Sequence, residues 1–260
     1  MRAFYAFPLV AACAVAASSC GDGATDPSLQ AVTLASVLPG HAALRSKLRQ
    51  ILEEKNGGLG FEMWATILDR NGLVVDVVFS GVNRGDQWPG SRVISAQKAN
   101  TANAFSLAGF ALSTANLYAA VQPGGSLFGL QESNPVNPVV AYAGPASAYG
   151  STSDPMIGRR IGGINVFGGG LALYDSSGEL IGAVGVSGDT SCADHNIAWK
   201  LRDALVLDFV PAGVNPVSGD DNIVYDIQPD GSSPSGWGHP ECSAAATAVA
   251  EGLPTNFPLN

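Results

Sequence analysis

Apolar residues near position 50 recur at the spacing of an amphipathic helix. Four of them fall at positions i, i+4, i+7 and i+8, which is one face of a helix: Leu44, Leu48, Ile51 and Leu52. Two glycines at positions 57 and 58 then end the pattern. We therefore predict a helix over residues 41–55.

Two later stretches have the pattern of β-hairpins, with apolar strands on both sides of a turn signal. Residues 61–68 and 73–80 flank the turn 69–72, which contains Asn-Gly, a pair favoured in tight hairpins. Residues 161–174 and 179–187 flank the turn Asp175-Ser176-Ser177-Gly178. Three glycines at 168–170 indicate a bulge or a close backbone approach inside the second hairpin.

Each hairpin precedes a predicted helix. The first helix runs over about 92–113, with Ser91 as its N-cap, and is rich in Ala, Ser and Asn. Such small side chains allow either tight packing on a sheet or the close approach of a flat ligand, and the sequence leaves both open. The second helix runs over about 193–207, where Ser191 and Asp194 have the spacing of a capping box.

The remaining segments are rich in Pro, Gly and Ser. Residues 115–121 fit a short helix, and 128–158 read as a long ordered loop with one short strand at most. Residues 211–260 read as a C-terminal extension packed on the surface. The order helix, hairpin, helix, loop, hairpin, helix predicts an α+β fold, with a central antiparallel sheet and helices packed on it.

Charge and histidine content exclude several classes of function. The chain has 13 Lys and Arg against 22 Asp and Glu, a formal net charge of −9 and no basic run, which argues against a nucleic-acid partner. Its three histidines, His41, His195 and His239, are too few for a multi-histidine metal cage, so no metal site is expected. The sequence motifs of phosphate-binding loops, serine hydrolases and zinc proteases are absent.

The first 20 residues have the pattern of an export signal. One arginine precedes a short apolar stretch that ends in Ser18-Ser19-Cys20, which resembles a bacterial lipoprotein signal. We expect lipidation at Cys20, a tether over 21–38, and a periplasmic or cell-surface location with the membrane reached only through the lipid. The alternative is simple secretion after cleavage behind Ala16.

Two cysteines then remain in the exported chain, Cys192 and Cys242. In an oxidising compartment, such a pair is a candidate disulfide that would tie the extension to the domain. The alternative is two separate buried thiols. A zinc site built on two cysteines alone lacks matching ligands at the usual spacing.

Three stretches resemble the GlcG/HbpS-like family, also known as the haem-degrading or PduO C-terminal type. They are the strand and turn 63–72, the helix segment 95–102, and Gly182-Ala183-Val184-Gly185-Val186-Ser187-Gly188 followed by Asp194 and Ile197-Ala198. The resemblance covers about 44–207 and implies a domain over 39–210 with a profilin-like three-layer fold. It also implies frequent oligomers, haem binding in some members and haem breakdown in a few.

A haem site needs an axial ligand and cations for the propionates. The candidate ligands are His195 and His41, and the candidate cations among the site residues are Arg92 and Lys98, with Arg84 and Arg159 as further choices. Each histidine could instead be a packed or capping residue, and each cation could form an ordinary salt bridge. We expect an exported haem-binding or tetrapyrrole-binding protein that could also degrade haem. The alternative is a non-enzymatic oligomeric structural or sensory protein of the cell envelope.

Overall fold

The computed structural model describes residues 38–260. The predicted signal, Cys20 and the tether up to residue 37 lie outside the described residues. The main elements along the chain are α2 (His41–Leu52), β1 (Trp64–Asp69), β2 (Val74–Phe79), α3 (Ser91–Phe105), α4 (Leu130–Ser133), α5 (Pro138–Ala141), β3 (Gly170–Tyr174), β4 (Leu180–Ser187), α6 (Ser191–Ala204) and α7 (Ala244–Asn256). The 3₁₀ turns are η1 (Thr114–Leu117), η2 (Ala119–Val121) and η3 (Ala146–Ala148).

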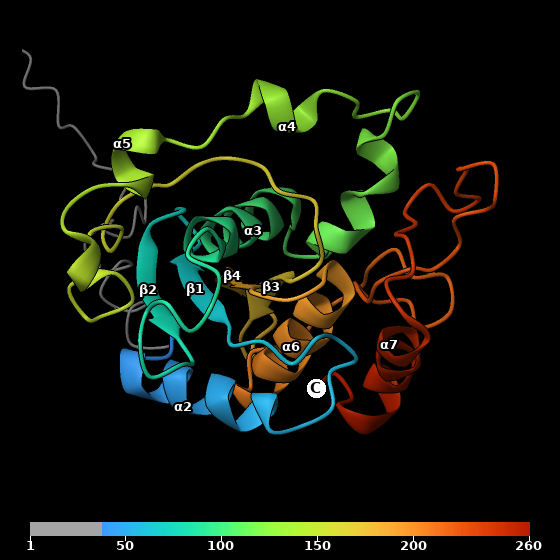
Figure 1. Ribbon diagram of the computed structural model, residues 1–260. Helices are drawn as coiled ribbons and strands as arrows, with labels where there is room; N and C mark the ends of the chain where they lie inside the picture. Colours follow the sequence, from blue (N-terminus) through green and yellow to red (C-terminus); the bar gives the residue numbers. More distant parts are fainter. Residues whose placement is uncertain (1–37) are drawn as a thin grey trace, which may run out of the picture.

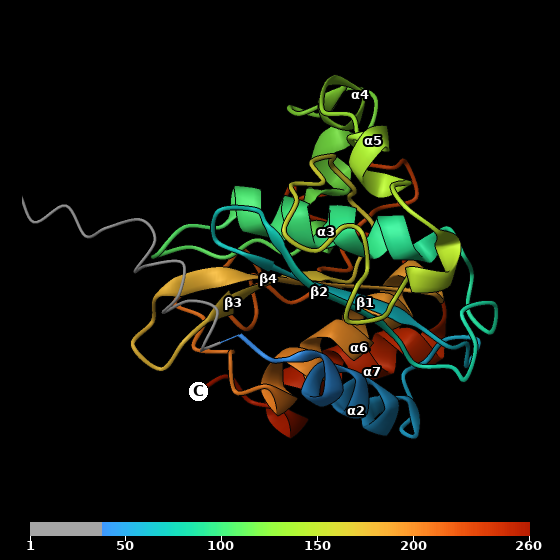
Figure 2. The same ribbon diagram turned by 90° about the vertical axis from the view of Figure 1, so that its left-hand side faces the viewer.

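Both hairpins belong to one antiparallel sheet of four strands in the order β2-β1-β4-β3. Helix α3 covers one face, and α2 and α6 cover the other, where α7 packs against α6 (Figures 1 and 2). The predicted α+β architecture and its three-layer arrangement are therefore confirmed. Among the residues that the structure describes, none of the helices combines the length and the hydrophobicity needed to cross a bilayer.

Strand β1 is central, so both its faces are buried. Ile67 and Ala65 face α2 and α6, whose apolar residues Leu44, Leu48 and Ile197 complete a single core cluster. Burial of such side chains contributes about 1.5–3 kcal/mol each. The helical stripe predicted at residues 44–52 is thus the surface that attaches α2 to the sheet.

On the opposite face, small residues allow α3 to lie unusually close to β3 and β4. A Cβ atom added at Gly185 would lie 1.9 Å from the backbone oxygen of Ser95, and one added at Gly170 would lie 2.4 Å from that of Lys98. The side chains of Thr66 and Ser95 hydrogen-bond at 2.8 Å in the same layer. Tight packing on the sheet therefore explains the small residues of α3, and the glycines at 168–170 make the close backbone approach that the sequence indicated.

The ends of several elements differ from the prediction. Helix α3 ends at Phe105 rather than near residue 113, and Ser91 is its first residue rather than its cap. The cap of α6 is Thr190, whose side chain accepts a hydrogen bond from the Ala193 N–H. In the first hairpin only Gly72 has a positive φ, +77°, so the turn is not the two-residue type that Asn-Gly favours.

Two segments contain helices that the sequence did not indicate. Residues 128–158, all of which the structure describes, hold α4, α5 and η3 and no strand of the sheet. The extension contains α7, which packs against α6 (Figure 1). Its sequence shows little contrast between faces, because alanines lie both on the buried side, with Leu253, and on the exposed side.

The contact between α3 and β4 predicts a strong effect of Gly185→Ala. The added methyl group would overlap a backbone oxygen that cannot move without shifting α3, so we expect a loss of about 3 kcal/mol in unfolding free energy. Urea denaturation measures this change. The matched control is Gly109→Ala, at an exposed site with open space around it. Equal stability of the two variants would contradict the close packing.

Candidate functional site

The site begins with an acidic residue inside an apolar strand. Asp76 lies among four valines in β2, and its register opposite Ile67 places it on the face that α2 covers. Its buried carboxylate accepts hydrogen bonds of 2.8 Å from its neighbour's backbone N–H, at Val77, and from Nδ1 of His41. Because a carboxylate only accepts, Nδ1 carries a proton and Nε2 of a neutral His41 keeps its lone pair.

A pocket of about 630 Å³ adjoins His41, and we call it the His41 pocket. Its walls come from α2, the end of β2, the loop 82–85 and the segment 147–152. The aromatic rings of Phe79 and Tyr149 and the guanidinium groups of Arg45 and Arg84 are among its lining groups. The His41 side chain is 21% exposed, and its Nε2 has no hydrogen-bond partner among the residues that the structure describes.

The two arginines of the pocket differ in how they are held. Arg45 donates to the backbone oxygens of Phe79 and Gly81, at 2.9 and 2.8 Å, and its guanidinium lies 4.9 Å from the centre of the Phe79 ring. Arg84 is exposed, and within residues 38–260 it forms no ion pair. The pocket therefore offers one fixed and one adjustable cation.

A buried ion pair holds the opposite wall. Arg92 binds the carboxylate of Asp154 through two nitrogens and donates to the Ala141 oxygen at 2.8 Å. The Arg92 guanidinium lies 3.6 Å from the centre of the Tyr149 ring, and Asp154 also accepts the N–H of Gly150 at 2.7 Å. This network fixes Tyr149 and Gly150 in the wall, and Asp154 neutralises the charge of Arg92.

A second buried ion pair joins the two helices that follow the hairpins. Lys98 of α3 donates to Asp194 of α6 at 2.6 Å and to the Val186 oxygen at 3.1 Å. Burial raises the pKa of Asp194 to about 6 and lowers the pKa of Lys98. The other oxygen of Asp194 accepts the N–H of Asp189 at 2.9 Å. Both charged groups are thus neutralised by each other and hydrogen-bonded inside the protein, so neither is available to a ligand.

His195 lies in the core of the molecule rather than in a pocket. Its side chain is fully buried, and Nε2 lies 3.0 Å from the Asn222 oxygen. The pKa of His195 is lowered to about 4, mainly because burial disfavours its charged form. The pKa of His239 is likewise lowered to about 4 by burial.

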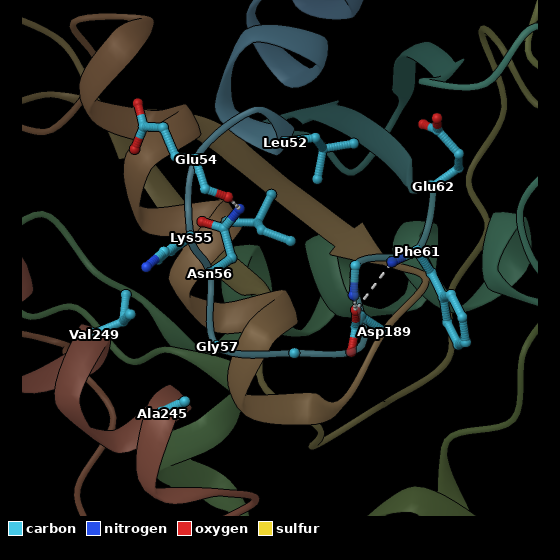
Figure 3. A pocket seen from close by; sticks show the side chains of 13 residues that line it. Leu52, Glu54, Lys55, Asn56, Gly57, Phe61, Glu62, Asp189, Ala245 and Val249 are labelled. Atoms are coloured by element: carbon cyan, nitrogen blue, oxygen red, sulfur yellow. Dashed lines mark hydrogen bonds between the residues drawn. The ribbon is translucent and has the colours of Figure 1, made fainter.

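A second cavity, of about 420 Å³, lies between the loop 53–62, α6 and α7 (Figure 3). Its most enclosed acidic group is Asp189, whose carboxylate accepts the N–H groups of Leu59, Gly60 and Phe61. Figure 3 shows this loop curling over Asp189. In the turn before α6, the N–H of Asp189 is paired with Asp194 and that of Thr190 with Asp189. These amides and carboxylates satisfy one another, which disfavours a phosphate at this turn.

The family model described as "Haem degrading protein HbpS-like" matches residues 42–202. The chain belongs to this family. None of the curated proteins matches it. Among solved structures, Klebsiella pneumoniae protein ORFY, of family DUF336, is 26% identical to it, with a TM-score of 0.42, over 64% of this chain and 90% of that one. The crystal structure of a PduOC:haem complex is 24% identical, with a TM-score of 0.44, over 64% of this chain and 94% of that one.

The HbpS-like chain brings only some of its candidate residues together. His41 and Arg84 line the same pocket, whereas Lys98 and His195 line neither of the two pockets described above. Arg92 is paired with Asp154 behind the pocket wall, and Arg159 is exposed and lines neither pocket. Sequence reasoning missed Asp76 and Arg45. The signals were an acidic residue inside a valine run, and an arginine one helical turn after His41.

Replacing Lys98 with Met tests the buried pair of the HbpS-like domain. The substitution leaves the Asp194 carboxylate buried without its cation, so we expect a loss of about 3–5 kcal/mol in unfolding free energy. Urea denaturation measures it, with the exposed Lys55→Met as control. Adding Asp194→Leu to the first variant should recover part of the loss. A single variant as stable as the wild type would show that the pair is not structural.

The buried His195 predicts a pH dependence of stability. Its pKa is about 4 in the folded chain and about 6.5 when unfolded, so the unfolded state binds the extra proton as the pH falls through this window. Stability should therefore decrease toward pH 4, by at most about 1.4 kcal/mol per pH unit for this residue. The raised pKa of Asp194 has the opposite effect, because this group adds stability as the pH falls. That contribution is the same in the wild type and in a His195 variant, so it cancels when the two are compared.

The contribution of His195 is isolated by comparing the wild type with His195→Gln. Unfolding free energies measured between pH 7 and pH 4 should show a shallower slope in the variant, whatever its absolute stability. Identical slopes would mean that His195 is not buried in its neutral form.

Proposed function

We propose that this protein binds haem in the His41 pocket, with Nε2 of His41 as the axial ligand of the iron. The hydrogen bond of 2.8 Å between His41 Nδ1 and Asp76 carries the proposal. Histidines that bind metals usually donate their other ring N–H to a carboxylate or carbonyl, which fixes the tautomer and makes the ligand nitrogen more basic. His41 has this arrangement before any metal is present, and its side chain lines a pocket.

The residues of the pocket fit a flat, anionic group. Its volume of about 630 Å³ lies within the range of about 300–1,000 Å³ for small-molecule sites. Phe79 and Tyr149 provide aromatic surface for a macrocycle, and Arg45 and Arg84 provide cations for carboxylates. When bound, haem would supply the iron centre for redox chemistry, while the protein supplies the ligand, its orientation and the charge balance.

The other residues considered as haem partners have supporting roles in this proposal. Arg92 and Asp154 position the wall that contains Tyr149. Lys98 and Asp194 hold α3 and α6 together, and His195 is a core residue. His41 is thus preferred over His195 because an axial ligand must be reachable from a pocket, and the imidazole of His195 is fully buried.

We also propose that the protein acts outside the cytoplasm, attached to a membrane through lipid at Cys20. The support is the residue pattern of positions 1–20, together with the pair of cysteines that remains after its removal. Assembly into a homo-oligomer stays a prediction from the family resemblance. An exported protein of this kind would bind haem outside the cytoplasm, before the haem enters the cell.

Haem titration of the purified protein, followed by absorption spectroscopy, tests the site. The wild type should develop a Soret band at one haem per chain. His41→Ala should weaken binding by more than about tenfold and shift the band, because the iron loses its protein ligand. Asp76→Asn should weaken it by about 10–100-fold while keeping the ligand, because the imidazole loses its orienting carboxylate.

Two further variants sharpen the result. Arg84→Ala should lower haem affinity without shifting the band, since it removes only a propionate partner. His195→Gln, with its fold checked by circular dichroism, should bind as the wild type does. Unchanged spectrum and affinity in His41→Ala would refute the assignment, and a loss confined to His195→Gln would move the ligand to the core histidine.

A further inference from the structure

A disulfide joins Cys192, in the first turn of α6, to Cys242, just before α7. The pairing predicted from the cysteine count is therefore confirmed. Cys192 is fully buried, whereas Cys242 is exposed at the surface. The disulfide thus joins a residue of the interior to a residue at the surface.

A histidine that the haem proposal does not use lies beside this disulfide. Nδ1 of His239 is 4.0 Å from Sγ of Cys192. One potential ligand atom from each of Cys192, Cys242 and His239 lies within 4.8 Å of the other two. Nδ1 of His239 donates to the Pro240 backbone oxygen at 2.7 Å, because a carbonyl only accepts, and the same oxygen lies 3.5 Å from Sγ of Cys192. We call these three side chains the sulfur–imidazole cluster.

We propose that reduction of the disulfide turns the sulfur–imidazole cluster into a binding site for a zinc-like divalent ion. Tetrahedral zinc sites have Zn–S and Zn–N bonds of about 2.3 and 2.0–2.1 Å, which place S and N ligands about 3.6 Å apart and two S ligands about 3.8 Å apart. The nitrogen of His239 and the sulfur of Cys192 are close to that separation already. The two sulfur atoms, once unbonded, need only side-chain rotation to reach theirs.

The surroundings of His239 favour this role. Its Nε2 lies 2.8 Å from the Ser191 hydroxyl, which can donate to Nε2 in the protein as it stands and accept from it when the ring proton moves from Nδ1 to Nε2. That change of tautomer breaks the hydrogen bond from Nδ1 to Pro240 and frees the Nδ1 lone pair for an ion. The Ser191 hydroxyl would orient the ring as the outer ligands of metal sites do. Two thiolates and one imidazole are a ligand set that suits zinc, and the exposed side of Cys242 provides an entry path. A water molecule or the Pro240 oxygen can complete four-coordination.

The reaction balances with a thiol as the reductant. Two external thiols reduce the Cys192–Cys242 bond to two cysteine thiols and are themselves oxidised to a disulfide. Each cysteine thiol then loses a proton as its sulfur binds the ion, so two protons are released per ion. Reoxidation reverses both steps, and the cluster holds either a disulfide or a metal ion, never both. This inference is independent of the haem proposal, because neither its residues nor its ligand are shared.

Titration with Cd²⁺ tests the cluster, since cadmium thiolates have a charge-transfer absorption band in the ultraviolet. The haem-free protein as isolated is compared with protein reduced by a phosphine that is then removed without air. The reduced protein should bind one Cd²⁺ per chain with this band, and Zn²⁺ should displace it. The oxidised protein should show no band.

Variants separate a metal site from two adventitious thiols. His239→Gln should weaken Cd²⁺ binding to the reduced protein by at least about tenfold, while the control His41→Gln should leave it unchanged. Cys242→Ser should abolish the band. Equal affinity of His239→Gln and the reduced wild type would overturn the site. So would a reduced protein that loses its circular dichroism signal and does not regain it with Cd²⁺, because the cluster would then not exist without the disulfide.

Discussion

The ion pair between Lys98 and Asp194 is the interaction on which the arrangement of the layers depends. Lys98 belongs to the helix on one face of the sheet, and Asp194 belongs to the helix on the other. The two side chains meet at the end of β4. A glycine leaves room for the Lys98 ammonium there, since a Cβ at Gly169 would lie 3.2 Å from its nitrogen. Two charges in the interior are costly unless they pair, so the two helices must meet at this one place.

The same rule governs most of the basic residues in the interior. Arg92, Lys98 and Arg202 are almost completely buried, and each pairs with one carboxylate, from Asp154, Asp194 and Asp221 respectively. Two of the cations chosen as haem partners for their charge, Arg92 and Lys98, are therefore already neutralised. The His41 pocket differs because its arginines bind backbone oxygens or face solvent, so their charge remains available to a ligand.

The extension after residue 210 is built into this structure rather than laid over it. Asp221 neutralises Arg202, the Phe257 oxygen accepts the indole N–H of Trp199, and Cys242 bonds to Cys192. All three partners lie on α6. The extension therefore packs along the side of α6 that carries these residues and His195, and His239, in the extension, is buried in the same contact. Chemistry at α6 is for this reason tied to the redox state of the disulfide, whereas chemistry at the His41 pocket is not.

The sequence by itself determined the elements whose signal is local. The stripe of α2, the two hairpins and the small residues of α3 follow from spacing and turn residues, which act over a few positions. The cysteine pair followed from the count once export was assumed. Helix α7 was not predicted, because it is alanine-rich and its faces do not differ in polarity. The N-cap of α6 was predicted one residue too late, because Thr190 and Ser191 are both able to cap.

Only the tertiary structure decided which side chains are available. His41, His195 and His239 look alike in the sequence, yet one meets a carboxylate beside a pocket, one is sealed in the core and one lies against a disulfide. Their partners are separated from them by 35, 27 and 47 residues. Local patterns fix the conformation of a segment, but burial and pairing arise from contacts between distant segments, and these contacts set the chemistry of each imidazole.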